Sequence, residues 1–285
     1  MTNLYDASFQ VFKNCVLCGN NIFINIGKGG SGIISHPQIV KCKKCKLLFT
    51  NPIRKQSSLN ALYNNFNEKY ESSLYFNREK ITSQATYFLK KCKNISTKPK
   101  FLNIGSANGN VNNVFCQVGW ESFGIEPSKD LYENSKKNFP LIKVYHCTLE
   151  DADFKENSFD LIHFWHVIEH LKDPMISLDK IFYWLKPGGM LNLGTPCSNN
   201  ILDLISQKFR KKYSLGYYHT FIFSKNNLAM ALKKTGFDIL EHKIYPSGNV
   251  KSSNGGFYSK IKYIISLIYP KAVSNMQKAL VAKPL

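Results

Sequence analysis

Between residues 101 and 195, short apolar runs alternate with helix-like segments. The apolar runs that predict strands are FLNIG, SFGIE, LIKVYH, SFDLIHFWH and KPGGMLNLGTP. The segments between them predict helices over 110–118, 127–138 and 173–185. Asp173 is placed to cap the last of these helices, with Pro174 at its first position. Strands that alternate with helices in this order predict an α/β fold, in which a parallel sheet carries helices on both faces.

The regions around this core predict an organisation in three parts. Residues 1–55 form a cysteine-rich head, and residues 56–97 form a connector whose apolar residues recur at the three- and four-residue spacing of helices. A polar stretch with one proline, residues 94–100, separates the connector from the main domain, residues 98–285.

Two more elements are predicted towards the C-terminus, a helix over 226–235 and a strand FDILEHKIY. Residues 253–271 form an insertion before the last strand-like run, QKALVAKPL. The apolar core of this insertion has flanking lysines and is too short to span a membrane. Residues 257–271 therefore lie on a membrane surface as an amphipathic helix, pack against the domain, or line a site for a lipid-linked acceptor.

The run FLNIG leads into a glycine-bearing turn, Gly105 to Gly109, and the next run ends in Glu126. In a βαβ unit this arrangement gives a tight backbone turn that a ligand can approach. It also places a carboxylate about 20 residues later, where it can accept the hydroxyls of a ribose. The pattern predicts a cofactor that carries a nucleoside. By itself it does not distinguish a dinucleotide from other nucleosides.

Two CxxC pairs lie 23 residues apart in the head: Cys15, Cys18, Cys42 and Cys45. Two thiolates three residues apart can share one tight turn, and two such turns together make the closed tetrahedral site that Zn²⁺ prefers. Gly19 suits the turn after the first pair, and short strand-like segments flank a GKGGSG turn, so we predict a zinc ribbon with a structural metal. His36 fits less well as a replacement ligand, and four free cysteines are the alternative.

The composition is that of a globular protein, with 44% hydrophobic residues in a chain of 285. A formal net charge of +19 raises the question of a nucleic-acid partner. Of the 38 basic residues, however, 35 are scattered lysines, and only Arg54, Arg78 and Arg210 are arginines. Surfaces that read nucleic acid cluster arginine with aromatic residues. The scattered lysines therefore disfavour nucleic acid. They predict either a solvated basic surface or a surface that attracts anionic substrates or an anionic membrane.

The N-terminal segment has no apolar core of the kind found in secretory signals, and no run approaches ~18 uninterrupted apolar residues. These features predict a cytoplasmic protein, in which the eight cysteines form no disulfides. The cysteines outside the head are expected to be small buried hydrophobic residues: Cys92, Cys116, Cys147 and Cys197.

The string TLEDADFKENSFDLIHFWHVIEHLKDPMISLDKIFYWLKPGGMLNLGTP resembles class I S-adenosylmethionine-dependent methyltransferases. Paired cysteine turns that continue into KLLFTNP, and a late HTFIFSKNNLAMALKKTGF segment, resemble in particular the subgroup with an N-terminal zinc ribbon found in bacterial surface-glycan pathways. The resemblance covers nearly the whole chain. It implies a Rossmann-like sheet of seven strands whose last strand is antiparallel, S-adenosylmethionine as the cofactor, and a sugar or glycan acceptor.

The residues that the resemblance assigns to cofactor binding are Asn103, Gly105, Ser106, Ala107, Gly109, Glu126, Pro127, Leu149, Glu150, Phe164, Trp165 and His166. The turn 105–109 would lie under the methionine part, and Glu126 would accept both ribose hydroxyls. Leu149 and Glu150 would lie along the adenine. Residues 164–166 end the fourth strand and would face the sulfonium and the substrate, at the carboxyl edge where open α/β sheets bind ligands.

Two positions depart from the family's usual pattern. An acidic residue is usual where this chain has Asn103, and a glycine is frequent where it has Ala107. Asn103 can accept a hydrogen bond but supplies no charge to the cofactor's ammonium, and Ala107 is tolerable at negative φ. We expect the first departure to weaken cofactor affinity without abolishing activity, because Glu126 and the fourth-strand signature are intact.

Methyl transfer to a hydroxyl needs alignment of the acceptor and removal of its proton, and a histidine is the natural base. His166, at the end of the fourth strand, is either that base, a substrate contact or a structural residue. His219 opens the segment that commonly shapes the acceptor side and is the second candidate. Glu169 and His170 are expected to organise the intervening loop through backbone hydrogen bonds.

The remaining histidines are expected at the surface or as satisfied strand residues: His36, His146, His163 and His242. Four aromatic residues are either an acceptor wall or ordinary core residues: Trp165, Tyr217, Tyr218 and Phe221. The sequence thus predicts a cytoplasmic methyltransferase that methylates an oxygen of a nucleotide-linked sugar or glycan. The alternatives are an RNA methyltransferase, a small-molecule methyltransferase of the phenol or quinone type, and a non-catalytic module that binds the cofactor or a partner.

Overall fold

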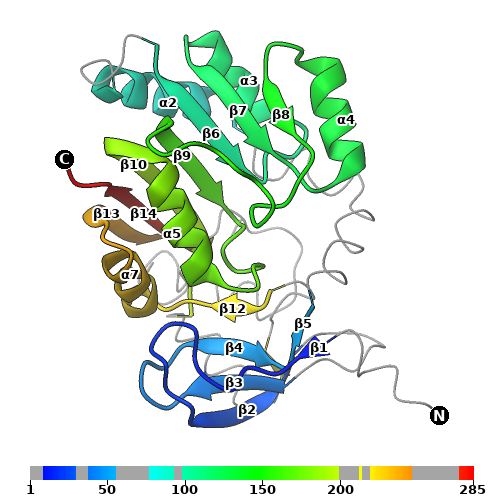
Figure 1. Cartoon of the computed structure of the whole chain (residues 1–285), viewed down its shortest axis with the longest axis vertical. Coiled ribbons are helices and arrows are strands. Elements are labelled where there is room, and N and C mark those ends of the chain that lie inside the picture. Colours follow the sequence, from blue (N-terminus) through cyan, green and yellow to red (C-terminus); the bar gives the residue numbers. More distant parts are fainter. Residues whose placement is uncertain are drawn as a thin grey trace, which may run out of the picture.

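A computed structural model describes residues 9–29, 38–55, 77–92, 98–198, 212–213, 219–245 and 276–285 of the chain. It consists of a large sheet covered by helices and a smaller sheet that carries the cysteines, in the lower part of Figure 1. Several predicted features lie outside the described residues: the insertion 253–271, the first part of the connector, His36, Tyr217 and Tyr218.

The large sheet has seven strands in the order β13-β14-β10-β9-β6-β7-β8. Their bounds are β6 (Lys100–Ile104), β7 (Glu121–Ile125), β8 (Lys143–Tyr145), β9 (Phe159–Trp165), β10 (Leu185–Pro196), β13 (Asp238–Tyr245) and β14 (Met276–Ala282). Strand β14 pairs antiparallel with β10 and β13, and the other neighbours run parallel. The predicted Rossmann-like sheet of seven strands, with an antiparallel last strand, is confirmed.

The described helices are α2 (Arg78–Cys92), α3 (Asn110–Gln117), α4 (Lys129–Asn138), α5 (Pro174–Trp184) and α7 (Lys225–Lys234). Asp173 caps α5 as predicted, because its side chain accepts hydrogen bonds from two backbone amides of the first turn. Helix α4 begins two residues later than predicted, since Ser128 occupies its N-cap position. Helix α7 begins with a capping box between Ser224 and Asn227.

Helices cover both faces of the sheet, as the alternation along β9 shows. Leu161 packs in one cluster with Phe88 of α2 and Phe115 of α3. Phe164, which points to the other face, belongs to the cluster that contains Ile181 of α5. Both faces of the central strand are therefore buried, which explains why its sequence is apolar almost throughout.

The smaller sheet has five strands in the order β11-β2-β3-β4-β12. Their bounds are β2 (Phe23–Gly29), β3 (Gln38–Cys42), β4 (Leu48–Asn51), β11 (Lys212–Tyr213) and β12 (Phe221–Ile222), and a separate pair is formed by β1 (Phe9–Gln10) and β5 (Ile53–Arg54). The head thus takes two edge strands from segments that lie more than 150 residues later in the chain. The predicted boundary at residue 55 stays a prediction.

Seven cysteines with described side chains are free of disulfides. Cys197 is buried as expected, whereas Cys116 and Cys147 are only partly buried, and the side chain of Cys92 is not described. Among the described residues, no helix combines the length and apolar character needed to cross a membrane.

Candidate functional site

The four head cysteines converge from two backbone turns that share one geometry. Gly19 donates its amide to the carbonyl of Cys15 at 2.8 Å, and Lys46 donates to the carbonyl of Cys42 at 3.0 Å. Both residues have positive φ, 72° at Gly19 and 65° at Lys46. Glycine adopts this conformation without strain, so the sequence signals the first turn more clearly than the second.

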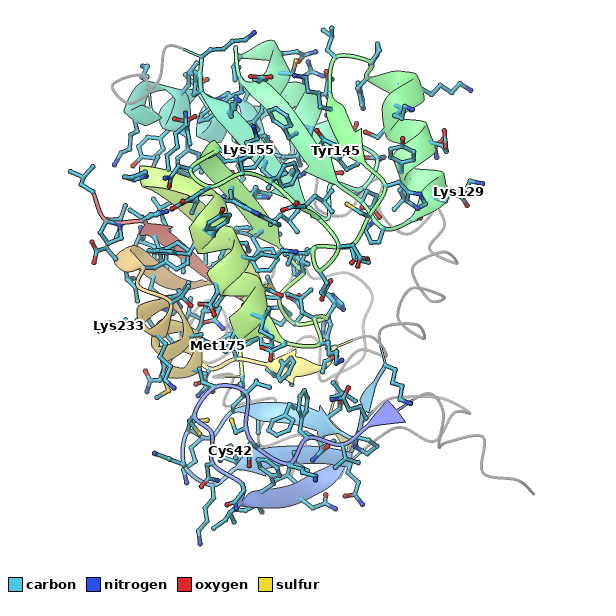
Figure 2. All side chains as sticks on the ribbon, in the orientation of Figure 1. Cys42, Lys129, Tyr145, Lys155, Met175 and Lys233 are labelled. Carbon is cyan, nitrogen blue, oxygen red and sulfur yellow. The ribbon has the colours of Figure 1, made fainter. Side chains whose placement is uncertain are left out.

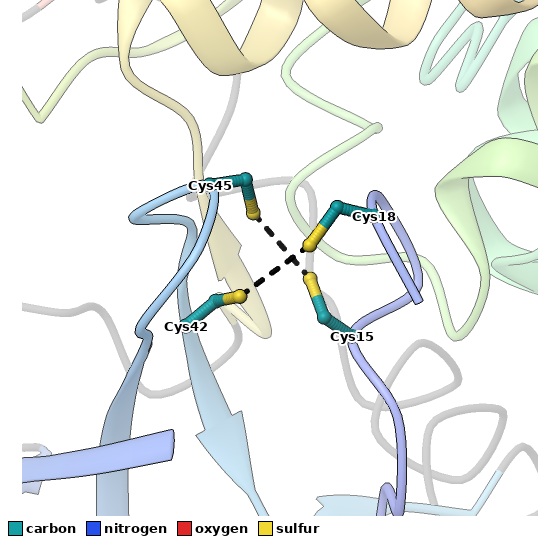
Figure 3. Close-up of side chains that lie close together, drawn as sticks. All are labelled: Cys15, Cys18, Cys42 and Cys45. Carbon is teal, nitrogen blue, oxygen red and sulfur yellow. Dashed lines mark hydrogen bonds between the residues drawn. The ribbon is translucent and has the colours of Figure 1, made fainter. Parts of the chain in front are cut away.

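The four sulfur atoms point toward one another (Figure 3). The Sγ–Sγ distances are 3.6 Å between Cys15 and Cys45 and 3.5 Å between Cys18 and Cys42, and all four atoms lie within 4.8 Å of one another. Tetrahedral zinc with bonds of about 2.3 Å places its sulfur ligands about 3.8 Å apart. The donor set therefore fits a zinc ion.

The protonation of these thiols supports the same conclusion. The hydrogen bond between Cys15 and Cys45 lowers the pKa of Cys15 to about 5 and raises the pKa of Cys45. Thiolates this close repel one another, so all four can lose their protons together only if a cation compensates the charge.

Helix α7 holds both cysteine turns against the main domain. The side-chain amide of Asn227 donates to the carbonyl of Cys45 at 2.7 Å, and Lys234 Nζ donates to the carbonyl of Leu17 at 2.7 Å. In Figure 2, Cys42 lies in the head and Lys233 of α7 lies above it.

The turn after β6 has the predicted shape, with left-handed backbone at three of its five positions. Gly105 has φ 71°, Ala107 52° and Gly109 81°. A Cβ at Gly105 would lie 2.8 Å from Cγ2 of Val167, so only glycine fits where this turn meets the end of β9. Alanine is tolerated at this position only at negative φ, and this condition is not met, so Ala107 sits where glycine is the unstrained residue.

Glu126 lies directly beside this turn and is only 5% exposed. Its Oε2 accepts the amide of Ala107 at 2.8 Å, and its Oε1 accepts the amide of Ser128 at 2.8 Å. Each carboxylate oxygen can accept more than one hydrogen bond. Glu126 can therefore brace the turn and still accept a ribose hydroxyl.

Other buried polar atoms in the candidate cofactor site have no hydrogen-bond partner among the described residues: Ser106 Oγ, Ser128 Oγ and Glu150 Oε1. Buried groups of this kind normally find a partner in protein, water or ligand. Their position around the turn and after β8, together with Glu126, fits a polar nucleoside cofactor.

Asn103 is turned towards the protein. Its side-chain amide donates to Asn112 Oδ1 at 2.8 Å, and Asn112 in turn donates to Ser122 Oγ at 3.1 Å and to the carbonyl of Phe123 at 2.7 Å. Asn103 is 3% exposed. The network ties β6 to α3 and β7, so Asn103 has a structural role that its position at the strand end did not reveal.

On the adenine side, the backbone carbonyls of Leu149 and Glu150 are fixed by Lys180 of α5, which donates to them at 3.3 Å and 2.6 Å. Leu149 is buried. Near Pro127, His146 Nε2 lies 3.1 Å from the proline carbonyl, and its ring stacks on Tyr132. These contacts give the predicted adenine side a fixed backbone.

The three residues that end β9 point in different directions. The ring of Phe164 is fully buried in the core, so a cofactor contact at this residue would come from its backbone. Trp165 stacks on His163 with a centroid separation of 5.5 Å and lies against Gly194 of β10. His166 is the residue whose side chain lies at the carboxyl edge.

His166 belongs to a buried hydrogen-bond cluster centred on Glu169. His166 Nδ1 lies 3.2 Å from Glu169 Oε1, and Thr195 Oγ1 donates to Glu169 Oε2 at 2.9 Å. His166 has φ 56°, a conformation that non-glycine residues adopt mostly at functional sites. Glu169 was expected to act through backbone hydrogen bonds, and its carbonyl does accept two amides. Its side chain also holds His166.

His170 and His219 complete the cluster. Their rings contact each other edge to face at 4.8 Å, and His170 Nε2 lies 3.9 Å from Glu169 Oε1. Burial, and then the neighbouring His170, lower the pKa of His219 to about 4. His219 is therefore neutral at physiological pH and a weak general base, which leaves His166 as the better candidate of the two.

The remaining aromatic and histidine residues have structural surroundings. Phe221 is buried and packs 6.0 Å from Phe49 of the head, so it joins head and domain and does not line an acceptor site. His163 lies 3.0 Å from the Asn192 amide, and His242 lies 3.0 Å from Gln277.

A family model for a methyltransferase domain matches residues 74–242 of the chain. The chain belongs to this methyltransferase family. Among curated proteins, the ubiquinone biosynthesis O-methyltransferase of Nitrobacter winogradskyi is 33% identical over 100 residues, which cover 34% of this methyltransferase and 38% of the relative. The matches to three curated relatives cover between 38% and 51% of the relatives' own length.

Solved structures share the fold. An S-adenosylmethionine-dependent methyltransferase from Archaeoglobus fulgidus superposes with a TM-score of 0.53 at 16% identity, over 75% of this chain and 98% of that chain. The cyclase SpnF superposes with a TM-score of 0.50 at 13% identity, over 72% and 82% of the two chains. The described part of this methyltransferase therefore has the fold of S-adenosylmethionine-dependent methyltransferases.

Proposed function

We propose that the protein is an enzyme that transfers the methyl group of S-adenosylmethionine to an oxygen of a small acceptor. The observation that carries the proposal is the placement of two groups at one edge of the sheet. Glu126 lies beside the turn after β6, and the pair His166–Glu169 lies at the end of the adjacent β9. In open α/β sheets this edge, where the strand order reverses, is the place where ligands bind.

The chain's own residues account for cofactor binding. Glu126 would accept the ribose hydroxyls, the turn 105–109 would lie under the amino-acid part, and Leu149 with Glu150 would flank the base. When bound, S-adenosylmethionine supplies a methyl group on a positively charged sulfur. Asn103 is neutral, so the cofactor's ammonium receives no charge from that position, and the side-chain amide of Asn103 donates to Asn112.

His166 is proposed as the general base. Its Nδ1 lies at hydrogen-bond distance from the buried Glu169. Burial raises the pKa of Glu169, but the hydrogen bond from His166 and the nearby histidines lower it more, so that the pKa is about 2. An ionised carboxylate at Nδ1 favours the tautomer in which Nε2 is basic. Nε2 would then take the proton of the acceptor hydroxyl as the methyl group is transferred.

For the acceptor, we propose a sugar, either nucleotide-linked or part of a surface glycan. The support is the likeness of the cysteine head, the fourth-strand signature and the late segment to zinc-ribbon methyltransferases of glycan pathways. A phenol or quinone acceptor is the second candidate, because the matching relative from Nitrobacter winogradskyi is named as an O-methyltransferase of ubiquinone biosynthesis. The scattered lysines continue to disfavour RNA.

We further propose that the four head cysteines hold one structural zinc ion, because the tetrahedral donor set has no position left for water or substrate. Its role would be to hold the two cysteine turns against α7. The cytoplasmic location and the membrane contact of residues 257–271 remain predictions of the sequence.

The proposal is tested by two measurements on the full chain. Isothermal titration should show binding of S-adenosylmethionine, and a screen with radiolabelled cofactor should show transfer to nucleotide sugars, with small phenols and RNA as the other arms. Transfer to a phenol alone would select the second acceptor class. Absence of cofactor binding would refute the enzyme and favour a binding module, and SpnF shows that this fold also occurs in a protein named as a cyclase.

A further inference from the structure

Glu169, His170 and His219 bring one carboxylate and two imidazoles together at the carboxyl edge of the sheet. Their ligand atoms lie within 4.8 Å of one another. We propose that these three residues bind a divalent first-row transition-metal ion, at a second metal site apart from the four cysteines. None of the three was assigned to cofactor binding, and Glu169 also orients His166.

The donor set has the chemistry of an open metal site. Two histidines and one carboxylate are a recurrent triad for catalytic zinc and for non-haem iron, and such sites keep positions for water or substrate. A metal requires neutral imidazoles and an ionised carboxylate. The three side chains supply these donors from two segments of the chain, with their ligand atoms within 4.8 Å of one another.

The carboxylate is already oriented by neighbours of the kind that surround metal ligands. Thr195 Oγ1 donates to its Oε2 at 2.9 Å, and His166 Nδ1 lies 3.2 Å from its Oε1. Glu169 itself is completely buried. Hydrogen bonds of this type fix the direction of a ligand carboxylate and tune its basicity.

The backbone brings the third ligand to the same place. The amides of Thr220 and Phe221 donate to the carbonyl of Glu169 at 2.7 Å and 3.0 Å, directly after His219. The segment that carries His219 is therefore attached to the residue that supplies the carboxylate. Two parts of the chain that lie 50 residues apart are thus held together before a metal binds. This lowers the free-energy cost of assembling the site.

Binding of a metal requires the three side chains to move slightly closer together. Ligand atoms about 2.0–2.2 Å from a tetrahedral metal lie about 3.3–3.6 Å from each other. His170 Nε2 is 3.9 Å from Glu169 Oε1, and all the ligand atoms lie within 4.8 Å of one another, so the side chains need to approach by between about 0.3 and 1.5 Å. Rotation of the histidine rings, which are part of an edge-to-face contact, can supply this movement.

The site lies next to the proposed reaction. Val167, in the same loop, packs against Gly105 of the cofactor turn. A metal here would have positions open to an acceptor oxygen and would lower the pKa of an acceptor hydroxyl. This last step rests on the proposed function, whereas metal binding at the three residues does not.

The test is a count of zinc in the tag-free full chain after equilibrium dialysis against Zn²⁺ and removal of loosely bound metal. The wild-type protein should retain two zinc ions per chain, and Glu169→Gln and His219→Gln should each retain one. His242→Gln, which changes a histidine on β13 outside the cluster, should retain two. A wild-type protein with one zinc, or either cluster variant with two, would overturn the proposal.

A second readout does not depend on how well the variants fold. Wild-type protein whose cysteine site is already filled with zinc should melt at a higher temperature when Co²⁺ is added, because a metal that binds the folded state stabilises it. The melting temperature of His242→Gln should rise in the same way. If the melting temperature of the wild type does not rise and the protein holds one zinc per chain, the three residues form a hydrogen-bonded cluster only. Failure of cofactor binding would refute the proposed function and leave this metal count unaffected.

Discussion

The backbone amide of Thr220 donates to the carbonyl of Glu169 at 2.7 Å. Thr220 also accepts, through its own carbonyl, the amide of Thr50 in the head at 2.9 Å. The strand that follows, β12, pairs with β4 of the head, and His219 directly precedes Thr220. The cysteine head is therefore connected by consecutive hydrogen bonds to the residue that holds His166. Through this link the head helps to hold the candidate site in position.

Loss of the cysteine site should therefore reduce activity as well as stability. Cys42→Ser should lose one zinc ion per chain and release the packing of β4 against β12. The resulting displacement of the segment 219–222 should lower turnover by about 10²-fold, the size of effect expected for a misplacement of about 1 Å. Metal analysis and an assay of methyl transfer would measure both effects.

The matched control is Cys116→Ser, which changes a partly buried cysteine of α3 outside the cluster. It should keep its zinc and its turnover. A Cys42→Ser protein that has lost zinc and yet turns over at the wild-type rate would show that the head does not support the site.

Glu126→Gln should weaken binding of S-adenosylmethionine by about 1.5–3 kcal/mol, or roughly 10- to 150-fold, because hydrogen bonds to a charged acceptor are lost. The amide also brings two donor hydrogens towards the backbone amides of Ala107 and Ser128, which the carboxylate accepts at 2.8 Å each. Isothermal titration on folded protein measures the affinity.

Glu121→Gln serves as the control for Glu126, since Glu121 pairs with Lys143 at the amino end of β7, away from the turn. Its affinity for the cofactor should equal that of the wild type. Equal affinities for all three proteins would mean that Glu126 braces the turn and does not touch the cofactor.

The fold was predictable from the sequence because its signals are local. Strand and helix periods, the N-cap at Asp173 and the CxxC spacing each depend on residues close together in the chain. The number of strands and the antiparallel last strand came from the family resemblance. The order of the strands was not predicted, since no local pattern states which strands become neighbours. The same limit applies to β12: nothing around Phe221 shows that it pairs with a strand near residue 49.

The carboxyl ends of β6 and β9, which the sequence analysis expected at one edge of the sheet, are neighbours in the structure, and Gly105 lies against Val167. That this edge binds the cofactor stays a prediction. The side-chain role of Glu169 was missed. Glu169 lies only three residues after His166, a spacing at which a turn can bring the two side chains together. Asn103 was assigned to the cofactor through the family resemblance, whereas its hydrogen bond to the buried Asn112 turns its side chain towards the protein.

Ala107→Gly should leave the free energy of unfolding unchanged or raise it by up to about 1.5 kcal/mol. At φ 52° an alanine costs about 1–2 kcal/mol relative to glycine, and the greater freedom of glycine in the unfolded chain offsets about 0.4–1 kcal/mol of the gain. Ala85→Gly, in the middle of α2, should instead lower the free energy of unfolding by about 1 kcal/mol or more. Denaturant titrations compare the two variants. A clear loss of stability in Ala107→Gly would contradict the backbone strain inferred at Ala107.

His166→Asn should lower turnover by about 10²- to 10⁴-fold, the range expected for removal of a general base. Asparagine is chosen because it tolerates the left-handed backbone, φ 56°, better than most residues, so that the loop and Glu169 keep their positions. Cofactor affinity should stay within about twofold of the wild type, since Glu126 and the turn after β6 are untouched. Turnover with saturating cofactor and isothermal titration separate these two effects.

His242→Gln is again the control and should retain full turnover. If His166→Asn also retains it, His166 is not the base, and the proton of the acceptor leaves by another group at the edge of the sheet.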